Sequence, residues 1–238
     1  MSNSARLKLT AASIGGGRGI FNEDALGHEV GMQESVSKLI PILQKEYPNI
    51  EFVWKKKITK REIVSKVNPK VSYRSEVKTS FVSPDGGVLF IKYKGKDYPI
   101  LISEAKKQGT HFFHKDGTLR KDLTETQSAL ALSGKLQGKG NAIERAYKNI
   151  EEFKLFCEDL NYFPYVLFAC GKDFESGSSI LDRLDAMTRY EPRNVNYVAD
   201  LPQKVTAYVQ EEYFTANEMF DKIYDVAKTS LRCIGVGV

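Results

Sequence analysis

A seven-residue apolar run, FPYVLFA at residues 163–169, constrains the fold of this chain more than any other feature. Apolar side chains at every position are typical of a strand that is covered on both faces, as strands of parallel sheets are. A helical stripe precedes this strand, and a capping box, Thr215 with Glu218, opens a last helix that runs to about Leu231. The stripe consists of Ile143, Tyr147, Ile150, Phe153, Cys157 and Leu160. We therefore predict an α/β fold with a central mixed β-sheet flanked by helices.

The remaining pattern predicts shorter elements within one domain that spans residues 1–238. We interpret residues 1–30, which are rich in glycine and serine, as a partly mobile N-terminal arm. Residues 107–137 are polar and weakly patterned, which favours a long loop or arm. The other predicted elements are helices at 33–46, 59–67 and 178–188, a strand at 50–54, hairpin strands at 87–94 and 98–103 with a turn at 95–97, and short segments around 195–209.

Composition excludes several classes of protein. Hydrophobic residues make up 42% and charged residues 27% of the 238 residues, as in an ordinary globular protein. No apolar run approaches the ~20 residues of a membrane helix, and the N-terminus lacks the apolar core of a secretion signal. The three cysteines, Cys157, Cys170 and Cys233, show no C-x-x-C spacing, which argues against a disulfide framework or a zinc site. We expect a cytoplasmic protein without a membrane partner.

The net charge of +5 permits a polyanionic partner, and the distribution of the charge says more. Basic residues form clusters on both sides of the predicted hairpin. They are Lys55, Lys56, Lys57, Lys60, Arg61, Lys92, Lys94, Lys96, Lys106, Lys107, Lys135 and Lys139. Each cluster alone is consistent with a solvated surface, whereas several clusters around one site favour phosphate binding.

Two carboxylates and a lysine lie at the margins of the hairpin, in SPDGG and SEAK. If Asp85 precedes the first strand and Glu104 ends the second, the hairpin brings the two carboxylates together. Lys106 follows Glu104 by two residues and shares its face of an extended chain. One or two carboxylates are the protein ligands that Mg²⁺ commonly has, with water and substrate phosphate as the others. A nuclease site is one interpretation of this set, and a structural ion pair is the alternative.

A second set of polar residues occurs in GKGNAIERAYKNIEEF at 138–153. Asn141, Glu144 and Arg145 gather at the first turn of the predicted helix, and helix N-termini attract phosphate. Asparagine pairs with adenine through two hydrogen bonds in the major groove, and arginine donates to purine N7. The alternative is a capping Asn141 followed by ordinary surface charges.

These motifs together resemble the EcoRI family of type II restriction endonucleases. GNAIER is accompanied by PDGG and EAK upstream and by further segments in the order in which that family has them. The further segments are GIF at 19–21, VSKL at 36–39, EYP at 46–48, FPYVLF at 163–168, ILDRLD at 180–185 and TSLR at 229–232. The resemblance implies a PD-(D/E)XK nuclease fold, a homodimer, Mg²⁺ dependence and double-strand cleavage of a short DNA palindrome. It also implies that the loop or arm at 107–137 embraces DNA.

The resemblance also implies roles for individual residues. Asp85, Glu104 and Lys106 would be catalytic, and the Ala105 carbonyl would join the two carboxylates in holding Mg²⁺. The residues predicted to read DNA bases are Gln137, Gly138, Lys139, Asn141, Ala142, Glu144, Arg145 and Arg183. Those predicted to contact the DNA backbone are Lys107, Gln108, Gly109 and Lys148. We expect a site with a central AATT, GAATTC, cleavage to 5′-phosphates and 5′ overhangs, and a companion DNA methyltransferase.

The chain departs from the family at Gln137–Gly140 and at Ala186, so part of the readout and the outer base pair stay open. His111 and His114 are spaced as H-x-x-H, but no third metal ligand accompanies them. Trp54 and the aromatic residues of 163–168 are expected in the core. Two other functions remain possible on this pattern: a structure-specific repair or junction nuclease of the same fold, and a DNA-binding module without catalysis.

Overall fold

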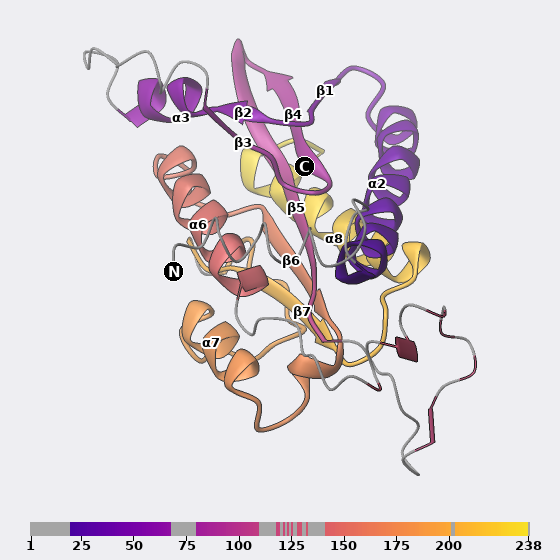
Figure 1. Ribbon diagram of the computed structural model, residues 1–238. Helices are drawn as coiled ribbons and strands as arrows, with labels where there is room; N and C mark the ends of the chain where they lie inside the picture. The colour runs from indigo at the N-terminus through magenta and orange to yellow at the C-terminus, as the bar shows by residue number, and fades with distance from the viewer. Residues whose placement is uncertain are drawn as a thin grey trace.

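The computed structural model describes residues 20–67, 80–109, 141–200 and 203–237, together with isolated positions between 118 and 132. A five-stranded sheet lies between two layers of helices (Figure 1). The strand order is β1-β4-β5-β6-β7. The strands are β1 (Glu51–Lys55), β4 (Gly87–Tyr93), β5 (Lys96–Lys107), β6 (Tyr165–Cys170) and β7 (Thr206–Gln210).

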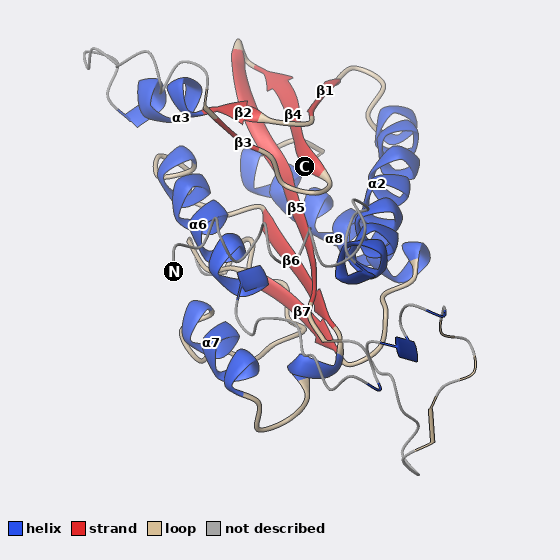
Figure 2. Cartoon of the chain, viewed as in Figure 1, coloured by secondary structure: helices blue, strands red, loops and turns tan. Residues whose placement is uncertain are grey.

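The sheet is mixed, as the sequence predicts. β1, β4 and β5 pair antiparallel, and β5, β6 and β7 pair parallel. A separate two-stranded ribbon, β2 (Ile58–Thr59) with β3 (Phe81–Val82), lies beside the β1 end (Figure 2). β5 is therefore the strand at which the antiparallel hairpin joins the parallel half of the sheet.

The central strand β6 confirms the prediction from FPYVLFA, because all six of its residues are buried. Tyr165, Leu167 and Ala169 face one core cluster, whereas Val166 and Phe168 face the other. This alternation follows the pleat of the strand. Both faces are consequently covered by helices.

One helical layer consists of α2 (Ile20–Glu46) and α8 (Ala216–Ile234), which pack against each other and against β5. The other layer contains α3 (Lys60–Val67), α6 (Asn141–Phe156) and α7 (Ser179–Met187). In Figure 1 the two layers lie on opposite sides of the sheet. The predicted capping box is present, since Thr215 Oγ1 accepts from the Glu218 N–H and the Glu218 carboxylate accepts from the Thr215 N–H.

Two predicted boundaries were wrong. α2 begins at Ile20 rather than near residue 33, so the second part of the predicted 1–30 arm is helical. Its buried positions include His28 and Ser35, whose polarity hides the helical period from a search for apolar residues. β5 runs to Lys107 instead of ending at residue 103, because its polar end pairs with β6.

The hairpin turn between β4 and β5 is also tighter than predicted. It contains only Lys94 and Gly95, both with positive φ (50° and 77°). Two consecutive residues with positive φ are characteristic of the two-residue turns that match the twist of a hairpin. Most of the predicted 107–137 arm, with His111 and His114, lies outside the described residues. No helix in the described part of the chain has the length and apolarity needed to cross a membrane.

Candidate active site

The hairpin brings Asp85, Glu104 and Lys106 together, as their positions in the sequence predict. Asp85 lies in the turn before β4, and the other two residues lie on β5. The Lys106 ammonium is 2.6 Å from Asp85 Oδ2 and 2.6 Å from Glu104 Oε1. All three side chains are largely buried, with exposed fractions of 15%, 1% and 15% for Asp85, Glu104 and Lys106.

The turn that carries Asp85 is fixed by its two glycines. The Gly86 N–H donates to the Ser103 carbonyl at 3.0 Å, and the Gly87 N–H donates to the Pro84 carbonyl at 3.0 Å. A Cβ on Gly86 would lie 2.1 Å from Ser103 Oγ, and Gly87 has a φ of +77°. Only glycine meets both requirements without strain. The two glycines thus allow the Asp85 turn to lie directly against the neighbouring strands β5 and β1.

Each carboxylate is held by a hydrogen bond in addition to its ion pair. Asp85 Oδ2 accepts from the Ala105 N–H at 3.1 Å. Glu104 Oε1 accepts from Asn149 Nδ2 at 3.1 Å, which reaches across from α6. Glu104 Oε2 is buried and has no hydrogen-bond partner among the described residues. The site therefore contains one buried carboxylate oxygen whose lone pairs are unused.

The electrostatics of the site follow from burial and from its three charges. Burial raises the pKa of Glu104, Lys106 lowers it, and the Asp85 charge raises it again. Burial alone would lower the pKa of Lys106, but the charges of Glu104 and Asp85 raise it above its ordinary value. Lys106 is therefore a permanent cation beside two acids.

The arrangement fits a hard divalent cation. Lys106 Nζ contacts Asp85 Oδ2, Glu104 Oε1 and, at 3.2 Å, the Ala105 carbonyl, so these three oxygens already converge around one positive charge. Carboxylate and carbonyl oxygens are ligands that Mg²⁺ accepts. Among the described residues, no three His, Cys, Asp or Glu side chains lie close enough together to hold a metal ion. Water and phosphate would therefore supply the other ligands. The unused Glu104 Oε2 is the kind of orphaned atom that an ion would satisfy.

Comparison with known proteins agrees with this geometry. The sequence profile described as "Restriction endonuclease EcoRI" matches residues 14–197. The type II restriction enzyme EcoRI of Escherichia coli is 31% identical over 258 residues, covering 91% of this chain and 89% of that protein. The chain belongs to the EcoRI family of restriction endonucleases.

A second relative, the type II restriction enzyme RsrI of Cereibacter sphaeroides, is 28% identical over 263 residues, covering 96% of this chain and 92% of that protein. As a member of the EcoRI family, the chain is a sequence-specific endodeoxyribonuclease that binds DNA and uses a divalent metal ion.

Four of the predicted base-reading residues, Asn141, Ala142, Glu144 and Arg145, belong to the first turns of α6. The helix begins at Asn141, and Glu144 and Arg145 are exposed in its first turns. Arg183 of α7 lies beside them, with its Nη1 3.5 Å from Glu144 Oε1. Gln137, Gly138 and Lys139 lie outside the described residues, and so do the side chains of Asn141 and Ala142.

Three of the predicted DNA-backbone contacts, Lys107, Gln108 and Gly109, also contact other parts of the protein. Lys107 points to the face of β5 opposite Lys106, where its ammonium lies over the Tyr213 ring and donates to the Tyr213 hydroxyl. Gln108 is 1% exposed, its N–H donates to the Cys170 carbonyl, and its carbonyl accepts from the Asp173 N–H. The Gly109 carbonyl accepts from the Lys172 N–H. These three residues thus hold the carboxyl end of β5 in place, whereas Lys148 is exposed on α6.

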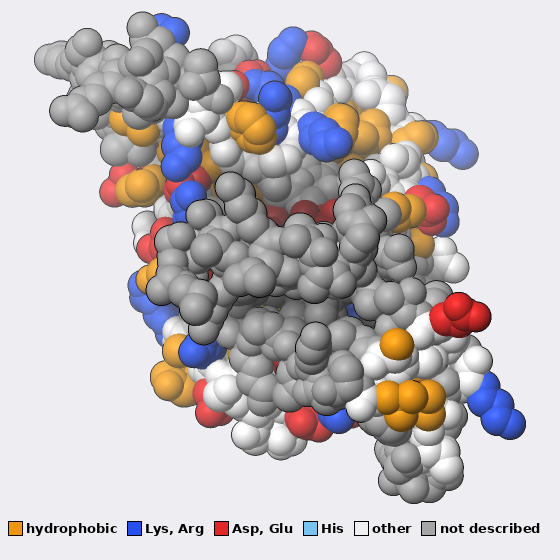
Figure 3. Space-filling view, in the orientation of Figure 1, with side chains coloured by type: hydrophobic (Ala, Val, Ile, Leu, Met, Phe, Trp, Pro, Cys, Tyr) orange, Lys and Arg blue, Asp and Glu red, His pale blue; other side chains and the backbone are white. Residues whose placement is uncertain are grey.

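The lysine clusters divide between ion pairs and open surface. Lys55 pairs with Glu62, Lys60 with Glu152 and Lys92 with Glu51. One lysine in each of the clusters at 55–57, 60–61 and 92–96 is thus part of an ion pair within the protein. Lys and Arg side chains still gather over α3 and the adjoining strands β1 and β4 (Figure 3).

Sequence reasoning missed three residues that support the site. Asn149 reaches Glu104, and Gln33 Nε2 donates to the Asp85 carbonyl at 3.5 Å. Trp54, which was expected in the core, is 44% exposed, and its indole N–H donates to the Gly86 carbonyl at 2.9 Å. The prediction for Trp54 was wrong because β1 is the edge strand of the sheet. Phe163, Tyr165 and Phe168 are buried as predicted.

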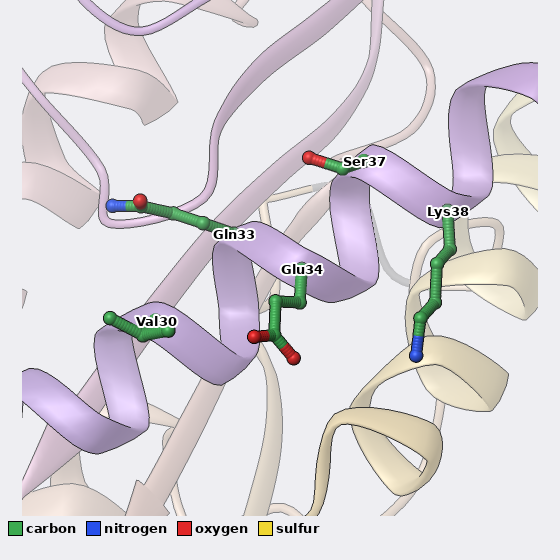
Figure 4. A pocket seen from close by; sticks show the side chains of 5 residues that line it. All are labelled: Val30, Gln33, Glu34, Ser37 and Lys38. Carbon is green, nitrogen blue, oxygen red and sulfur yellow. The ribbon is translucent and has the colours of Figure 1, made fainter.

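A shallow hollow on α2 lies apart from this site (Figure 4). Its lining side chains all come from one side of the helix. They are Val30, Gln33, Glu34, Ser37 and Lys38. Gln33 of this lining is hydrogen-bonded to the Asp85 turn, but neither Asp85 nor Glu104 lines the hollow.

Proposed function

We propose that this chain is a Mg²⁺-dependent, homodimeric restriction endonuclease that cuts a DNA palindrome with a central AATT, GAATTC. The observation that carries the proposal is the convergence of Asp85, Glu104 and the Ala105 carbonyl around one positive charge. The relatives named as type II restriction enzymes EcoRI and RsrI support the choice of a restriction enzyme over a structure-specific nuclease.

The residues of the site have distinct tasks in phosphodiester hydrolysis. Asp85, Glu104 and the Ala105 carbonyl would hold Mg²⁺. When bound, this ion polarises a phosphate and lowers the pKa of a coordinated water. Lys106 would donate hydrogen bonds toward the attacking water and offset the negative charge that develops on the phosphoryl oxygens. In-line attack at phosphorus expels the 3′-oxygen, so the products carry 5′-phosphates, and by the family pattern 5′ overhangs.

The end of α6 supports the proposed sequence preference. Asparagine matches the hydrogen-bonding edge of adenine, and each good bidentate contact is worth ~1–3 kcal/mol of discrimination. Asn141, Ala142, Glu144 and Arg145 would form the adenine-reading turn together with Gln137, Gly138 and Lys139. Arg183, which lies beside Glu144, would extend this surface toward the outer base pair. Lys148 would bind a phosphate.

Symmetry supports the homodimer. A palindrome has two equivalent half-sites, and a protein with a two-fold axis places one active site on each strand.

A nuclease that cuts such sites would also cut the DNA of its own host unless these sites were modified. A DNA methyltransferase of the same specificity would therefore be its functional partner.

The test is digestion of a plasmid of known sequence with Mg²⁺, followed by sequencing of the ends. We expect discrete fragments that begin with the same palindrome and carry 5′-phosphates. Asp85→Asn should lower the cleavage rate at least ~100-fold while site-specific binding is kept, because it removes a metal ligand and leaves the fold. Asp97→Asn, near the start of β5 and far along the strand from Glu104, is the matched control and should cut like the wild type.

Three results would contradict the proposal. Cleavage at branched or damaged DNA without a common end sequence would indicate a structure-specific nuclease. Specific binding without cleavage in Mg²⁺ or Mn²⁺ would indicate a DNA-binding module. Full cleavage by Asp85→Asn would remove the assigned metal ligand.

A further inference from the structure

Both donors that reach Glu104 bind the same carboxylate oxygen. Lys106 Nζ lies 2.6 Å from Oε1, and Asn149 Nδ2 lies 3.1 Å from it. The other oxygen, Oε2, is buried without a partner among the described residues. A carboxylate held in this way has a fixed orientation and keeps the lone pairs of its second oxygen for another ligand.

Asn149 belongs to the helix that carries the proposed base-reading residues. Asn141, Arg145 and Asn149 are spaced four residues apart and therefore lie along one side of α6. Eight residues of α-helix span ~12 Å. One helix thus presents DNA-reading groups at its N-terminal end and, two turns later, the amide that holds Glu104.

The opposite side of α6 is packed into the core. Ile143, Ala146, Ile150 and Phe153 are all at most 2% exposed in the core cluster on this face of the sheet. Protein cores are close-packed, so a displacement of the helix end is transmitted along the helix. A shift of the first turn would consequently change the Asn149–Glu104 hydrogen bond.

We propose that Asn149 is a positioning residue that orients Glu104 for the divalent cation and links the DNA-reading end of α6 to the metal site. The inference rests on the proposed function and extends it to the control of cleavage. When α6 binds the correct DNA site, the Asn149 amide stays hydrogen-bonded to Glu104 Oε1. When an incorrect site displaces the helix, this hydrogen bond is broken. The preference for the correct site over an altered site is then larger in the cleavage rate than in the binding affinity.

The experiment uses two variants that remove the donor without adding a charge: Asn149→Leu, which nearly keeps the shape of the side chain, and Asn149→Ala. Mn²⁺ binding to the full-length protein is measured by titration calorimetry. Residues that hold a metal ligand typically contribute 10–100-fold to metal affinity or activity. We expect Mn²⁺ affinity to fall by ~10–100-fold. Binding of the site duplex without metal should change less than ~2-fold, since the amide contacts the carboxylate rather than the helix end.

Cleavage under single-turnover conditions provides the second measurement. The Mg²⁺ concentration for half-maximal rate should rise in both variants, and the preference for the correct site over a site with one base changed should fall in cleavage more than in binding. Glu151→Gln is the matched control, because Glu151 is 45% exposed on the same helix and pairs only with Lys154 among the contacts described. It should leave all of these values unchanged.

Unchanged Mn²⁺ affinity and Mg²⁺ dependence in a folded Asn149 variant would overturn the inference, and two variants guard against the failure of one to fold. A wild-type protein that binds Mn²⁺ but cuts no DNA would overturn the proposed function, and the calorimetry would still decide the role of Asn149. A wild-type protein that binds no Mn²⁺ with or without the site duplex would overturn both.

Discussion

At the scale of single residues, Lys106 has a structural role in addition to its proposed catalytic one. Its ammonium contacts Asp85, Glu104 and the Ala105 carbonyl, and it is only 15% exposed. Two acids against one base leave the buried set with an excess of negative charge. Removing one partner of a buried ion pair typically costs 3–5 kcal/mol, because a charge is left uncompensated. In the metal-free protein, Lys106 is thus a structural counter-ion.

We predict that Lys106→Met destabilises the metal-free protein by ~3–5 kcal/mol and that Mn²⁺ restores most of the loss. A ligand that binds only the folded state stabilises it in proportion to the logarithm of its concentration over its Kd. Urea unfolding with and without Mn²⁺ measures both effects. Cleavage should be lost in either condition, since no group would replace the lysine in its proposed role on the attacking water.

Lys107→Met is the matched control for this prediction. Lys107 is adjacent in sequence, but its ammonium lies on the opposite face of β5 at Tyr213. Its loss should leave the stabilisation by Mn²⁺ equal to that of the wild type. Equal Mn²⁺ dependence in the two variants would contradict the role assigned to Lys106.

The triplet could be predicted from sequence because local geometry determines it. The alternation of a strand places Glu104 and Lys106 on one face, and a hairpin returns the second strand to the turn that carries Asp85. Asn149 could not be predicted, because its contact depends on where α6 crosses the sheet. Its only signal in the sequence is the four-residue spacing from Asn141 and Arg145.

At the scale of elements, the edge strand β1 supports the turn that carries Asp85 in the proposed active site. Trp54 pairs with Leu89 of β4 in the sheet register, and its indole N–H donates to the Gly86 carbonyl. The indole also lies against Gly87, where an added Cβ would be 2.6 Å from Nε1. β1 thereby clamps the turn that presents Asp85.

We predict that Trp54→Phe slows single-turnover cleavage by ~10-fold, because a 1 Å misplacement of a catalytic group can cost up to ~100-fold. The free energy of unfolding should fall by only about 1 kcal/mol, the worth of one ordinary hydrogen bond. Urea unfolding and cleavage assays on the same preparation separate the two effects. Glu51→Gln removes an exposed ion pair with Lys92 on the same strands and should change neither. Parallel losses in both variants would show that β1 acts only through general stability.

The elements that the sequence predicted well are those with a strong apolar period. β6, α7 and α8 appear close to their expected bounds. α2 and β5 were predicted too short, because the missing parts of both contain polar residues at buried positions. In β5 these polar residues are the proposed active-site groups, so the failure of the apolar pattern coincides with the site.

At the scale of the whole molecule, His28 lies where three parts of the fold meet. It comes from α2, its Nδ1 is 3.6 Å from Cys170 Sγ at the end of β6, and its ring stacks on Phe214 before α8 with centroids 6.0 Å apart. Burial, reinforced by the charges of Lys107 and Lys106, lowers the pKa of His28 to about 4. A proton on this ring would oppose the packing of one helical layer on the sheet.

The stability of the folded protein should therefore depend on pH through His28. Above its ordinary pKa of 6.5 the ring is neutral in both the folded and the unfolded state, so it contributes nothing. Between pH 6.5 and about 4 only the unfolded chain binds the proton, and stability falls as the pH falls. The raised pKa of Glu104 acts with the opposite sign, so the profile of the wild type alone does not isolate His28.

Comparison with His28→Leu does isolate it, because Glu104 is common to both proteins. We predict that the variant gains stability relative to the wild type as the pH falls from 7 to 4.5, by about 2–3 kcal/mol at ~1.4 kcal/mol per unit of pH. Urea unfolding at four pH values measures the difference. Parallel profiles would mean that the ring is protonated as easily in the folded protein as in the unfolded chain. The junction of α2, β6 and α8 would then be open to water rather than closed around a neutral imidazole.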